Sequence, residues 1–251
     1  MTPAEGAQPP LVRFLSKCNV ASREQARALV RAGRVRVNGR VVREGALRID
    51  PQRDRVLLDD DVVTWPDPAA DLVWWMVNKP RGVLATTHDP EGRPTVMDLV
   101  PTPVAPGLAP VGRLDKASAG LLLLANDNRL AARLLDPRSH VAKRYRVKAR
   151  GHPGEEALRR WRCETLRVQG LALGPMDVEV ERSGPRSTWL WITLAEGRNR
   201  QIRRRLEAEG HDVEVLVRVA FGPLELGTLP PGAARRLTGP ERALLEEAAG
   251  P

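Results

Sequence analysis

The feature that most constrains the fold is a succession of short apolar or alternating runs along residues 72–251, separated by glycine, proline and asparagine turns. The runs are VWWMVN, GLLLLA, YRVKA, MDVEVE, TWLWITL and VEVLVRV, and they outnumber the clear helical patterns at about 129–136, 153–162 and 199–209. Many strands joined by tight turns favour an antiparallel or mixed sheet over a doubly wound parallel one. We therefore expect residues 72–251 to form one α+β domain in which helices flank the sheet.

Residues 10–60 carry a different pattern, which predicts a small separate module. LVRFLSKC places four apolar residues on one helical face, and a second helix is predicted to start at the capping-box residue Ser22 and to end at Gly33. In VRVNGRVV, Asn-Gly between alternating valines is a strong hairpin signal, and RVLLD predicts a closing strand. The module should therefore fold as two helices followed by a small sheet.

A stripe of basic residues runs over this module. One helical face carries arginines at spacings of three and four, and the stripe continues on the hairpin. A solvated charged face is the ordinary explanation of such a stripe, but a continuous basic surface on a compact module favours contacts with phosphates. The residues expected to contact a nucleic acid here are Arg23, Arg27, Arg31, Arg34, Arg36, Asn38 and Arg40.

Composition limits the classes of function. The formal net charge is +9, which indicates a polyanionic partner, and nucleic acid is favoured over membrane because no basic amphipathic anchor is evident. Two cysteines far apart in sequence, and histidines without metal-ligand spacing, predict no disulfide framework, no metal site and a cytoplasmic location. No glycine-rich dinucleotide-binding or phosphate-binding loop is present.

The remaining segments are predicted to be connections. Residues 1–9 lack the charged start and apolar centre of a signal peptide, and we expect a short disordered lead. Residues 61–71 are acidic and carry two prolines, which predicts a linker between the two domains. Nothing indicates oligomerisation, so we expect a monomer.

One acid stands out in the larger domain. In VGRLDKASAG, Asp115 follows a glycine and precedes small residues and then the buried run LLLL. An acid just before a core strand lies on a loop at the rim of the sheet, where functional sites are commonly built. Spacing alone leaves two interpretations open, an aspartate that caps a turn and an aspartate that reacts with a ligand.

The strand KRYRVK contains the single tyrosine of the chain. Lys143, Tyr145 and Val147 should share one face of the strand, because side chains alternate along a strand. A core aromatic residue with its hydroxyl at the wet edge is one interpretation. The other is a ring that stacks on a nucleic-acid base, an interaction worth ~1–3 kcal/mol.

EGRNRQIRRRLEAEG predicts a helix that is capped by Asn199 and carries arginines in or near its first turn. Cations are misplaced at the positive N-terminal end of a helix, where each costs about 0.3–1 kcal/mol when exposed. One interpretation is a tolerated cluster of surface charges. The other is that anions neutralise these arginines, and the anions would be RNA phosphates or a carboxylate such as Asp115. The arginines concerned are Arg200, Arg203 and Arg204.

Both parts of the chain resemble known families. ASREQARALVRAGRVRVNGRVV is similar to the alpha-L, or S4-like, RNA-binding motif, which implies binding to structured RNA. VNKPRGVLATTHDPEGRPTVMDLVP, VGRLDKASAGLLLLANDNRLAARLL, KRYRV and EGRNRQIRRRLEAEGH resemble, in the same order, the signature blocks of bacterial ribosomal RNA pseudouridine synthases of the RsuA/RluB type. The resemblance covers nearly the whole chain.

The resemblance implies a cofactor-free isomerisation of uridine to pseudouridine in RNA. By motif, Asp115 corresponds to the catalytic carboxylate, acting as nucleophile or base at the sugar of a flipped-out nucleotide. Tyr145 corresponds to the tyrosine that packs on the base, and Arg203 to the basic residue that pairs with the aspartate. Lys79, Arg113, Arg200 and Arg204 fall in the same blocks and are expected to contact RNA.

The resemblance leaves the substrate open. NRQIRR looks like the large-subunit branch and HVAKRY like the small-subunit branch, and we favour a site in 23S over one in 16S ribosomal RNA. The expected partner is ribosomal RNA, free or in a subunit assembly intermediate. The alternative from another class is a non-catalytic RNA-binding assembly factor, although a pure binder has no need for a carboxylate in a basic groove.

Overall fold

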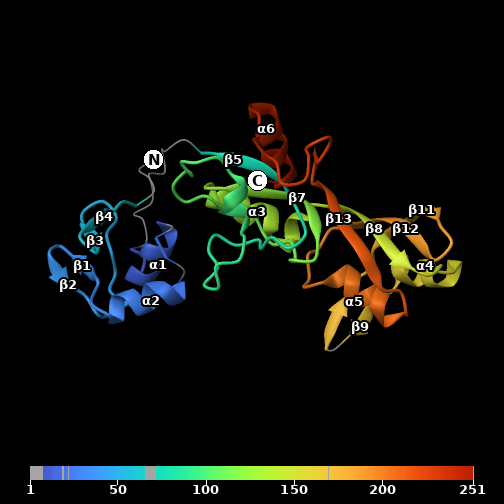
Figure 1. Ribbon diagram of the computed structural model, residues 1–251, viewed down its shortest axis with the longest axis horizontal. Coiled ribbons are helices and arrows are strands. Elements are labelled where there is room, and N and C mark those ends of the chain that lie inside the picture. The colour runs from blue at the N-terminus through green and yellow to red at the C-terminus, as the bar shows by residue number, and fades with distance from the viewer. Residues whose placement is uncertain (1–7, 19, 22, 66–71, 169, 251) are drawn as a thin grey trace. The chain divides into compact units, whose positions relative to one another are not determined.

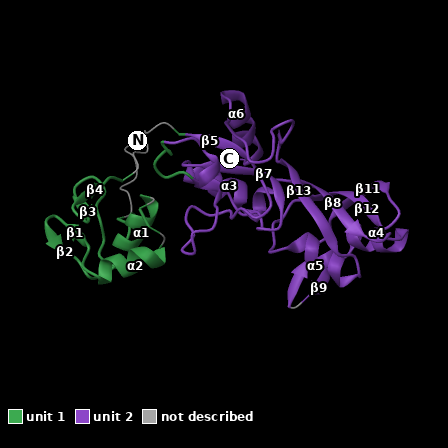
Figure 2. Ribbon diagram, in the orientation of Figure 1, with its two compact units in different colours: residues 1–72, 103–108 green, residues 73–102, 109–251 purple. Residues whose placement is uncertain are grey.

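A computed structural model of the chain describes residues 8–18, 20–21, 23–65, 72–168 and 170–250 (Figure 1). The chain divides into two compact units, residues 1–72 with 103–108 and residues 73–102 with 109–251 (Figure 2). Most of the expected lead and most of the expected linker lie outside the described residues, so both stay predictions. Residues 61–63, at the start of the expected linker, form a strand of the first unit. No helix among the described residues is long and apolar enough to span a membrane.

The first unit is the predicted helix–helix–sheet module. Helices α1 (Leu11–Lys17) and α2 (Arg23–Arg31) precede a sheet of order β2-β1-β3-β4. Its strands are β1 (Val35–Val37), β2 (Arg40–Val41), β3 (Val56–Leu58) and β4 (Asp61–Val63).

The predicted hairpin lies between β1 and β2. Asn38 and Gly39 connect these strands with φ angles of 50° and 81°, as a two-residue type I′ turn requires. The capping residue predicted for α2, Ser22, lies outside the described residues.

The second unit contains a mixed nine-stranded sheet, which confirms the predicted fold class. Its central path among the described residues is β11-β12-β8-β13-β7-β5-β15, and β6 and β14 pair with β7 and β13. Every pair is antiparallel except β7 with β13, which is parallel. The strands are β5 (Trp74–Lys79), β6 (Ala109–Pro110), β7 (Ala119–Ala125), β8 (Lys143–Arg150), β11 (Asp177–Ser183), β12 (Ser187–Leu194), β13 (Val213–Phe221), β14 (Leu224–Glu225) and β15 (Ala234–Arg236).

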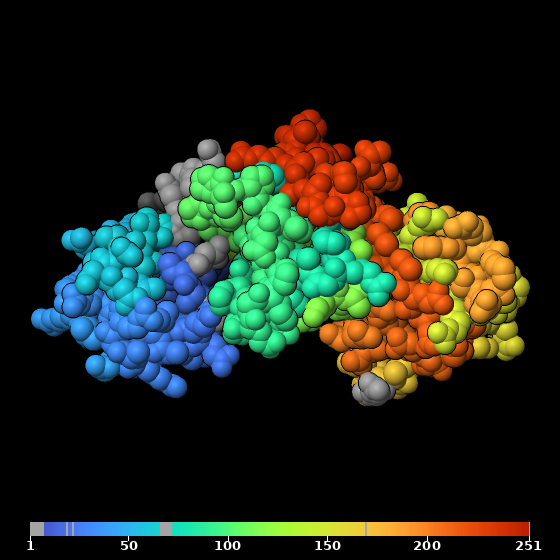
Figure 3. Space-filling model, in the orientation of Figure 1, coloured from blue at the N-terminus to red at the C-terminus, as the bar shows by residue number. Residues whose placement is uncertain are grey.

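Helices pack on this sheet around two separate cores. α3 (Asn128–Leu135) and α6 (Gly239–Ala248) contribute to the core built on β5 and β7, and α6 lies on the outer surface of the unit, where it is red in Figure 3. α4 (Glu155–Cys163) and α5 (Gln201–Ala208) contribute to the core built on β8, β11, β12 and β13. The short helices η1 (Val96–Leu99) and η2 (Pro137–Ser139), and the ribbon of β9 (Leu166–Val168) with β10 (Leu171–Leu173), complete the unit.

The parallel pair joins the two halves of the sheet at Gly120, which faces Arg218 in the pairing register. Gly120 has a φ of 107°, and a Cβ placed there would lie 2.2 Å from the carbonyl oxygen of Arg218 and 2.6 Å from its backbone nitrogen. Only glycine allows both this φ and this approach of the two backbones.

We therefore expect Gly120→Ala to lower the free energy of unfolding by at least about 2 kcal/mol, since backbone strain and overpacking add. Denaturant unfolding followed by circular dichroism measures this loss. The matched control is Gly227→Ala, at a positive φ of 56° with open space around the glycine, which introduces strain without a clash. Equal losses for the two variants would contradict a steric requirement at Gly120.

Candidate active site

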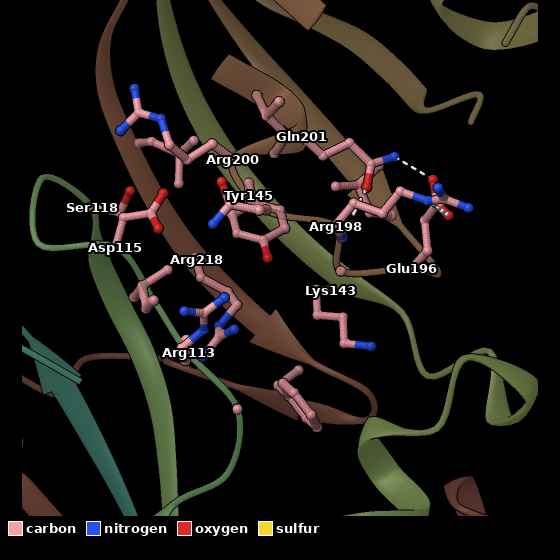
Figure 4. Close-up of a pocket in the computed structure, with 18 of the residues that line it drawn as sticks. Arg113, Asp115, Ser118, Lys143, Tyr145, Glu196, Arg198, Arg200, Gln201 and Arg218 are labelled. Carbon is pink, nitrogen blue, oxygen red and sulfur yellow. Dashed lines mark hydrogen bonds and ion pairs between the residues drawn. The ribbon is translucent and has the colours of Figure 1, made fainter. Parts of the chain in front are cut away.

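A cavity of about 530 Å³ lies in the second unit, within the range typical of ligand sites (Figure 4). Its walls come from the segment before β7, from β8 and β13, from residues 194–203, which run into α5, and from Leu135 and Pro137 of α3 and η2. The charged side chains that line it are six cations, Arg113, Lys143, Arg198, Arg200, Arg203 and Arg218, and two carboxylates, Asp115 and Glu196. The cavity therefore carries a large excess of positive charge.

Asp115 lies in a tight turn that ends where β7 begins. Its backbone carbonyl accepts a hydrogen bond from the Ser118 amide at 2.9 Å, and Gly112, three residues earlier, has a φ of 76°. Among the described residues, the carboxylate of Asp115 accepts no hydrogen bond and forms no ion pair. The side chain is therefore not a turn cap, and it is available to a ligand.

Tyr145 is a half-buried residue of β8 whose ring packs against the core of α4 and α5. It faces Arg218 of β13 in the pairing register, and Arg218 in turn faces Gly120 of β7. These pairings bring the lone tyrosine to the same cavity as Asp115, and Figure 4 shows its ring between Asp115 and Lys143. Tyr145 and Lys143 both line the cavity, as expected of two residues on one face of the strand.

Arg203 lies in the first turn of α5 and is 7% exposed. It donates to the carbonyl oxygens of Val213 at 2.8 Å and Ala117 at 3.3 Å, and its buried Nε has no partner within the described chain. Burial and the charge of Arg200 lower the pKa of Arg203, whereas the charge of Asp115 opposes this shift.

The predicted ion pair between Arg203 and Asp115 is absent from the described residues. The Arg203 guanidinium instead donates to the backbone carbonyl of Ala117, two residues beyond Asp115. This hydrogen bond holds the turn that carries the carboxylate. The sequence pattern also misassigned the helix cap. Arg200, not Asn199, occupies the N-cap position, with a φ of 50° and no side-chain cap.

The other residues expected to contact RNA in this unit differ in position. Arg113 and Arg200 line the cavity, whereas Arg204 does not and donates weakly to Asn199 Oδ1 at 3.4 Å. Lys79 is fully buried, and its ammonium donates to the carbonyl oxygens of Pro80 and Val83 at 2.9 Å each. Lys79 therefore supports the loop after β5, and the expectation that it contacts RNA is corrected by its burial.

In the first unit, every residue of the predicted basic stripe is exposed: Arg23, Arg27, Arg31, Arg34, Arg36, Asn38 and Arg40. Two of these arginines are paired, because Arg34 binds Asp59 and Arg36 binds Asp60 at 2.8 Å. The side chain of Asn38 bonds Asp54 and the amide of Arg55. The hairpin part of the stripe is thus largely neutralised, and the helical part keeps its charge.

Four charged residues that line the cavity were not assigned to the site from the sequence: Lys143, Glu196, Arg198 and Arg218. Arg218 is buried in β13, and Lys143 shares a strand face with Tyr145. Glu196 binds Arg198 at 3.0 Å, Gln201 and the amide of Gly174, and so fixes the loop before α5. The shared face of KRYRVK was a usable signal for Lys143, but no local pattern indicated Arg218 or Glu196.

The mixed-sheet domain has an open carboxylate in a basic cavity, and the first unit carries exposed arginines; both features suit a polyanionic ligand. Comparison with known proteins gives the family. The RNA pseudouridylate synthase family matches residues 73–208, and the S4 domain family matches residues 10–62. The chain belongs to the RNA pseudouridylate synthases and carries an N-terminal S4 domain.

Relatives match over nearly the whole chain. An uncharacterized RNA pseudouridine synthase of Mycobacterium tuberculosis (strain ATCC 25618 / H37Rv) is 40% identical over 99% of this chain and 98% of its own. Ribosomal large subunit pseudouridine synthase B of Bacillus subtilis (strain 168) is 34% identical over 91% of both chains. A crystal structure of a pseudouridylate synthase superposes with a TM-score of 0.67 at 28% identity, over 94% of this chain and 99% of that one.

Burial makes Lys79 a source of pH-dependent stability. Desolvation lowers the pKa of Lys79 to about 8 from 10.5; the charge of Asp115 opposes the shift and that of Arg218 adds to it. Between pH 8 and 10.5, Lys79 is protonated in a larger fraction of unfolded chains than of folded ones. The free energy of unfolding should therefore rise with pH over this range, by up to about 3 kcal/mol.

Urea unfolding at several pH values between 8 and 10.5 tests this expectation in the wild type and in Lys79→Met. The rise that Lys79 contributes should be missing in the variant, whose methionine fills a similar volume without a proton to lose. The same pH slope in both proteins would show that Lys79 does not titrate in this range.

Proposed function

We propose that this enzyme converts one uridine of ribosomal RNA into pseudouridine, with Asp115 as the reacting carboxylate. The observation that carries the proposal is the position of Asp115, whose carboxylate is unbonded within the described chain and lies in a cavity with six cations. The cations around it attract RNA phosphates.

The reaction needs the nucleotide outside the RNA helix. A uridine cannot be turned over while it is stacked, and extrusion costs a few kcal/mol, which phosphate contacts and stacking on an aromatic ring offset. Asp115 acts at the sugar, as nucleophile on the anomeric carbon or as base at the adjacent carbon, while the bond to the uracil nitrogen breaks. The uracil rotates and bonds the anomeric carbon through its carbon five; in the nucleophile route this attack breaks the bond to Asp115, and in the base route Asp115 returns its proton to the adjacent carbon. The proton from carbon five moves to the freed nitrogen.

Tyr145 and Arg203 have supporting roles in this proposal. Tyr145 packs on the uracil and takes part in removing the proton from carbon five. Arg203 holds the backbone after Asp115 through the carbonyl of Ala117, and its charge stabilises the ionised carboxylate. Arg203 is thus a positioning residue, and its effect on the reaction passes through Asp115.

Asp115→Asn should bind RNA with nearly normal affinity and form no pseudouridine, because the amide keeps the shape of the side chain but cannot react. Binding is measured by filter retention, and pseudouridine by chemical labelling and primer extension. Tight binding with measurable turnover would exclude Asp115 as the reacting group.

The substrate we favour is 23S ribosomal RNA. The NRQIRR block supports it, and so does the similarity to the ribosomal large subunit pseudouridine synthase B of Bacillus subtilis. Incubation with unmodified 23S and 16S transcripts, without cofactor, identifies the substrate by the transcript that gains pseudouridine. A signal on 16S alone would reverse the assignment, and tight binding without a signal on either would favour an assembly factor.

The S4 domain supplies the second half of the proposed RNA interaction. We expect Arg27→Gln with Arg31→Gln to weaken RNA binding and to reduce the dependence of log Kd on log salt by about one for each phosphate that the variant no longer binds. The control is Arg34→Gln with Arg36→Gln, because Asp59 and Asp60 already pair with these arginines. Affinity is measured across a salt series, and equal slopes for both double variants would argue against the helical stripe as the RNA-binding surface.

A further inference from the structure

Two buried cations of the cavity face one aromatic ring. Lys143 of β8 lies opposite Phe221 of β13 in the pairing register. The Lys143 ammonium is 5.3 Å from the centre of the Phe221 ring, and the Arg218 guanidinium carbon is 5.4 Å from it. All three residues line the cavity that contains Asp115, and Figure 4 shows Lys143 and Arg218 on the side of Tyr145 away from α5.

A β-bulge brings Arg218 and Phe221 to the same face of β13. Side chains alternate along a regular strand, so residues three apart point to opposite faces. The pairing of β13 with β8 shifts register between Arg218 and Ala220, which leaves Val219 as the extra residue. The bulge therefore re-aims Arg218, as bulges beside functional sites commonly do.

The two cations are buried without a counter-ion. Arg218 is 4% exposed and Lys143 is 9% exposed. Within the described chain neither forms an ion pair, and the Lys143 ammonium has no hydrogen-bond acceptor. Arg218 donates through Nε to the Leu121 carbonyl oxygen at 2.6 Å, but its buried Nη2 has no partner.

Such an arrangement is costly in the free protein. Burying a charge is unfavourable unless it is paired, and two like charges side by side add repulsion. Burial and the charge of Arg218 lower the pKa of Lys143, as expected for a cation without a partner. Of the two carboxylates in the cavity, Glu196 is already bound to Arg198.

We propose that Lys143 and Arg218 form a phosphate-binding subsite. The ligand is a phosphate oxyanion, which both cations bind and which relieves their repulsion, while the ring of Phe221 holds the two side chains in place. With a sugar at Asp115 and its base on Tyr145, the phosphate bound here is one next to the target uridine. The identity of this phosphate rests on the proposed function, but the anion site does not.

Inorganic phosphate tests the site without RNA. With the full chain at constant ionic strength, replacing chloride by phosphate should raise the Tm of the wild type in a saturable manner. Lys143→Met, which keeps the packing against Phe221, should lose this increase, and Lys143→Arg should restore it. The control Lys148→Met, on the same strand but paired with Glu214 at 2.8 Å, should keep the wild-type response. An equal response in the wild type and in Lys143→Met would overturn the proposal.

RNA with single methylphosphonate linkages tests whether the subsite binds a backbone phosphate or a free phosphate. The first measurement compares the affinity of the wild-type protein for these RNAs and needs no protein variant. Neutralising one linkage beside the target uridine should weaken binding by about tenfold or more, the effect of removing a charge-assisted hydrogen bond. In Lys143→Met the same linkage should cost little further affinity, whereas linkages elsewhere should have additive effects.

If Lys143→Met and the methylphosphonate weaken RNA binding additively at both linkages beside the target uridine, Lys143 and Arg218 do not bind the RNA backbone there. Saturable binding of inorganic phosphate with additive RNA effects would place a free phosphate, not the RNA backbone, in the subsite. Because both arms measure binding, they give an answer even if no pseudouridine forms. Conversely, if the Lys143 substitutions change neither the response to phosphate nor RNA binding, the proposed role of Asp115 in turnover is unaffected.

Discussion

The close parallel approach of β7 and β13 brings together the residues that line the cavity. At this crossing Gly120 faces Arg218, and Arg218 faces Tyr145 on the next strand. Since Asp115 lies in the turn just before β7, the crossing brings a carboxylate from one half of the sheet to a tyrosine from the other. Arg203 adds a second connection from α5 to the same turn through Ala117. Without a glycine at the crossing, the two halves of the sheet could not approach this closely.

Charge is the second constraint. The cavity gathers far more cations than carboxylates, and several of these cations are buried without an ion pair in the described chain. Backbone carbonyls solvate two of these cations, Arg203 and Arg218, and also solvate the buried Lys79 outside the cavity. The remaining positive charge is suited to a polyanionic substrate, which supplies the counter-charges that the protein lacks.

Much of the fold could be predicted because it depends on local patterns. Asn38-Gly39 indicated the hairpin, and the apolar runs indicated the strands of the mixed sheet. The partners of charged side chains could not be predicted, because they depend on residues far apart in sequence. Arg34 pairs with Asp59, and Lys79 is buried rather than exposed to RNA. Arg203 illustrates both outcomes, since its location near Asp115 was expected but its binding to backbone carbonyls was not.

The central claim is that a flipped-out uridine reaches Asp115. A crystal structure of the Asp115→Asn variant with its RNA tests this most directly, since the substrate cannot be turned over. The account predicts the anomeric carbon of the uridine within about 3–3.5 Å of the substituted side chain, the separation of a near-attack geometry, with the uracil against Tyr145. A uridine that stays stacked in the RNA helix, with the cavity unfilled, would contradict it.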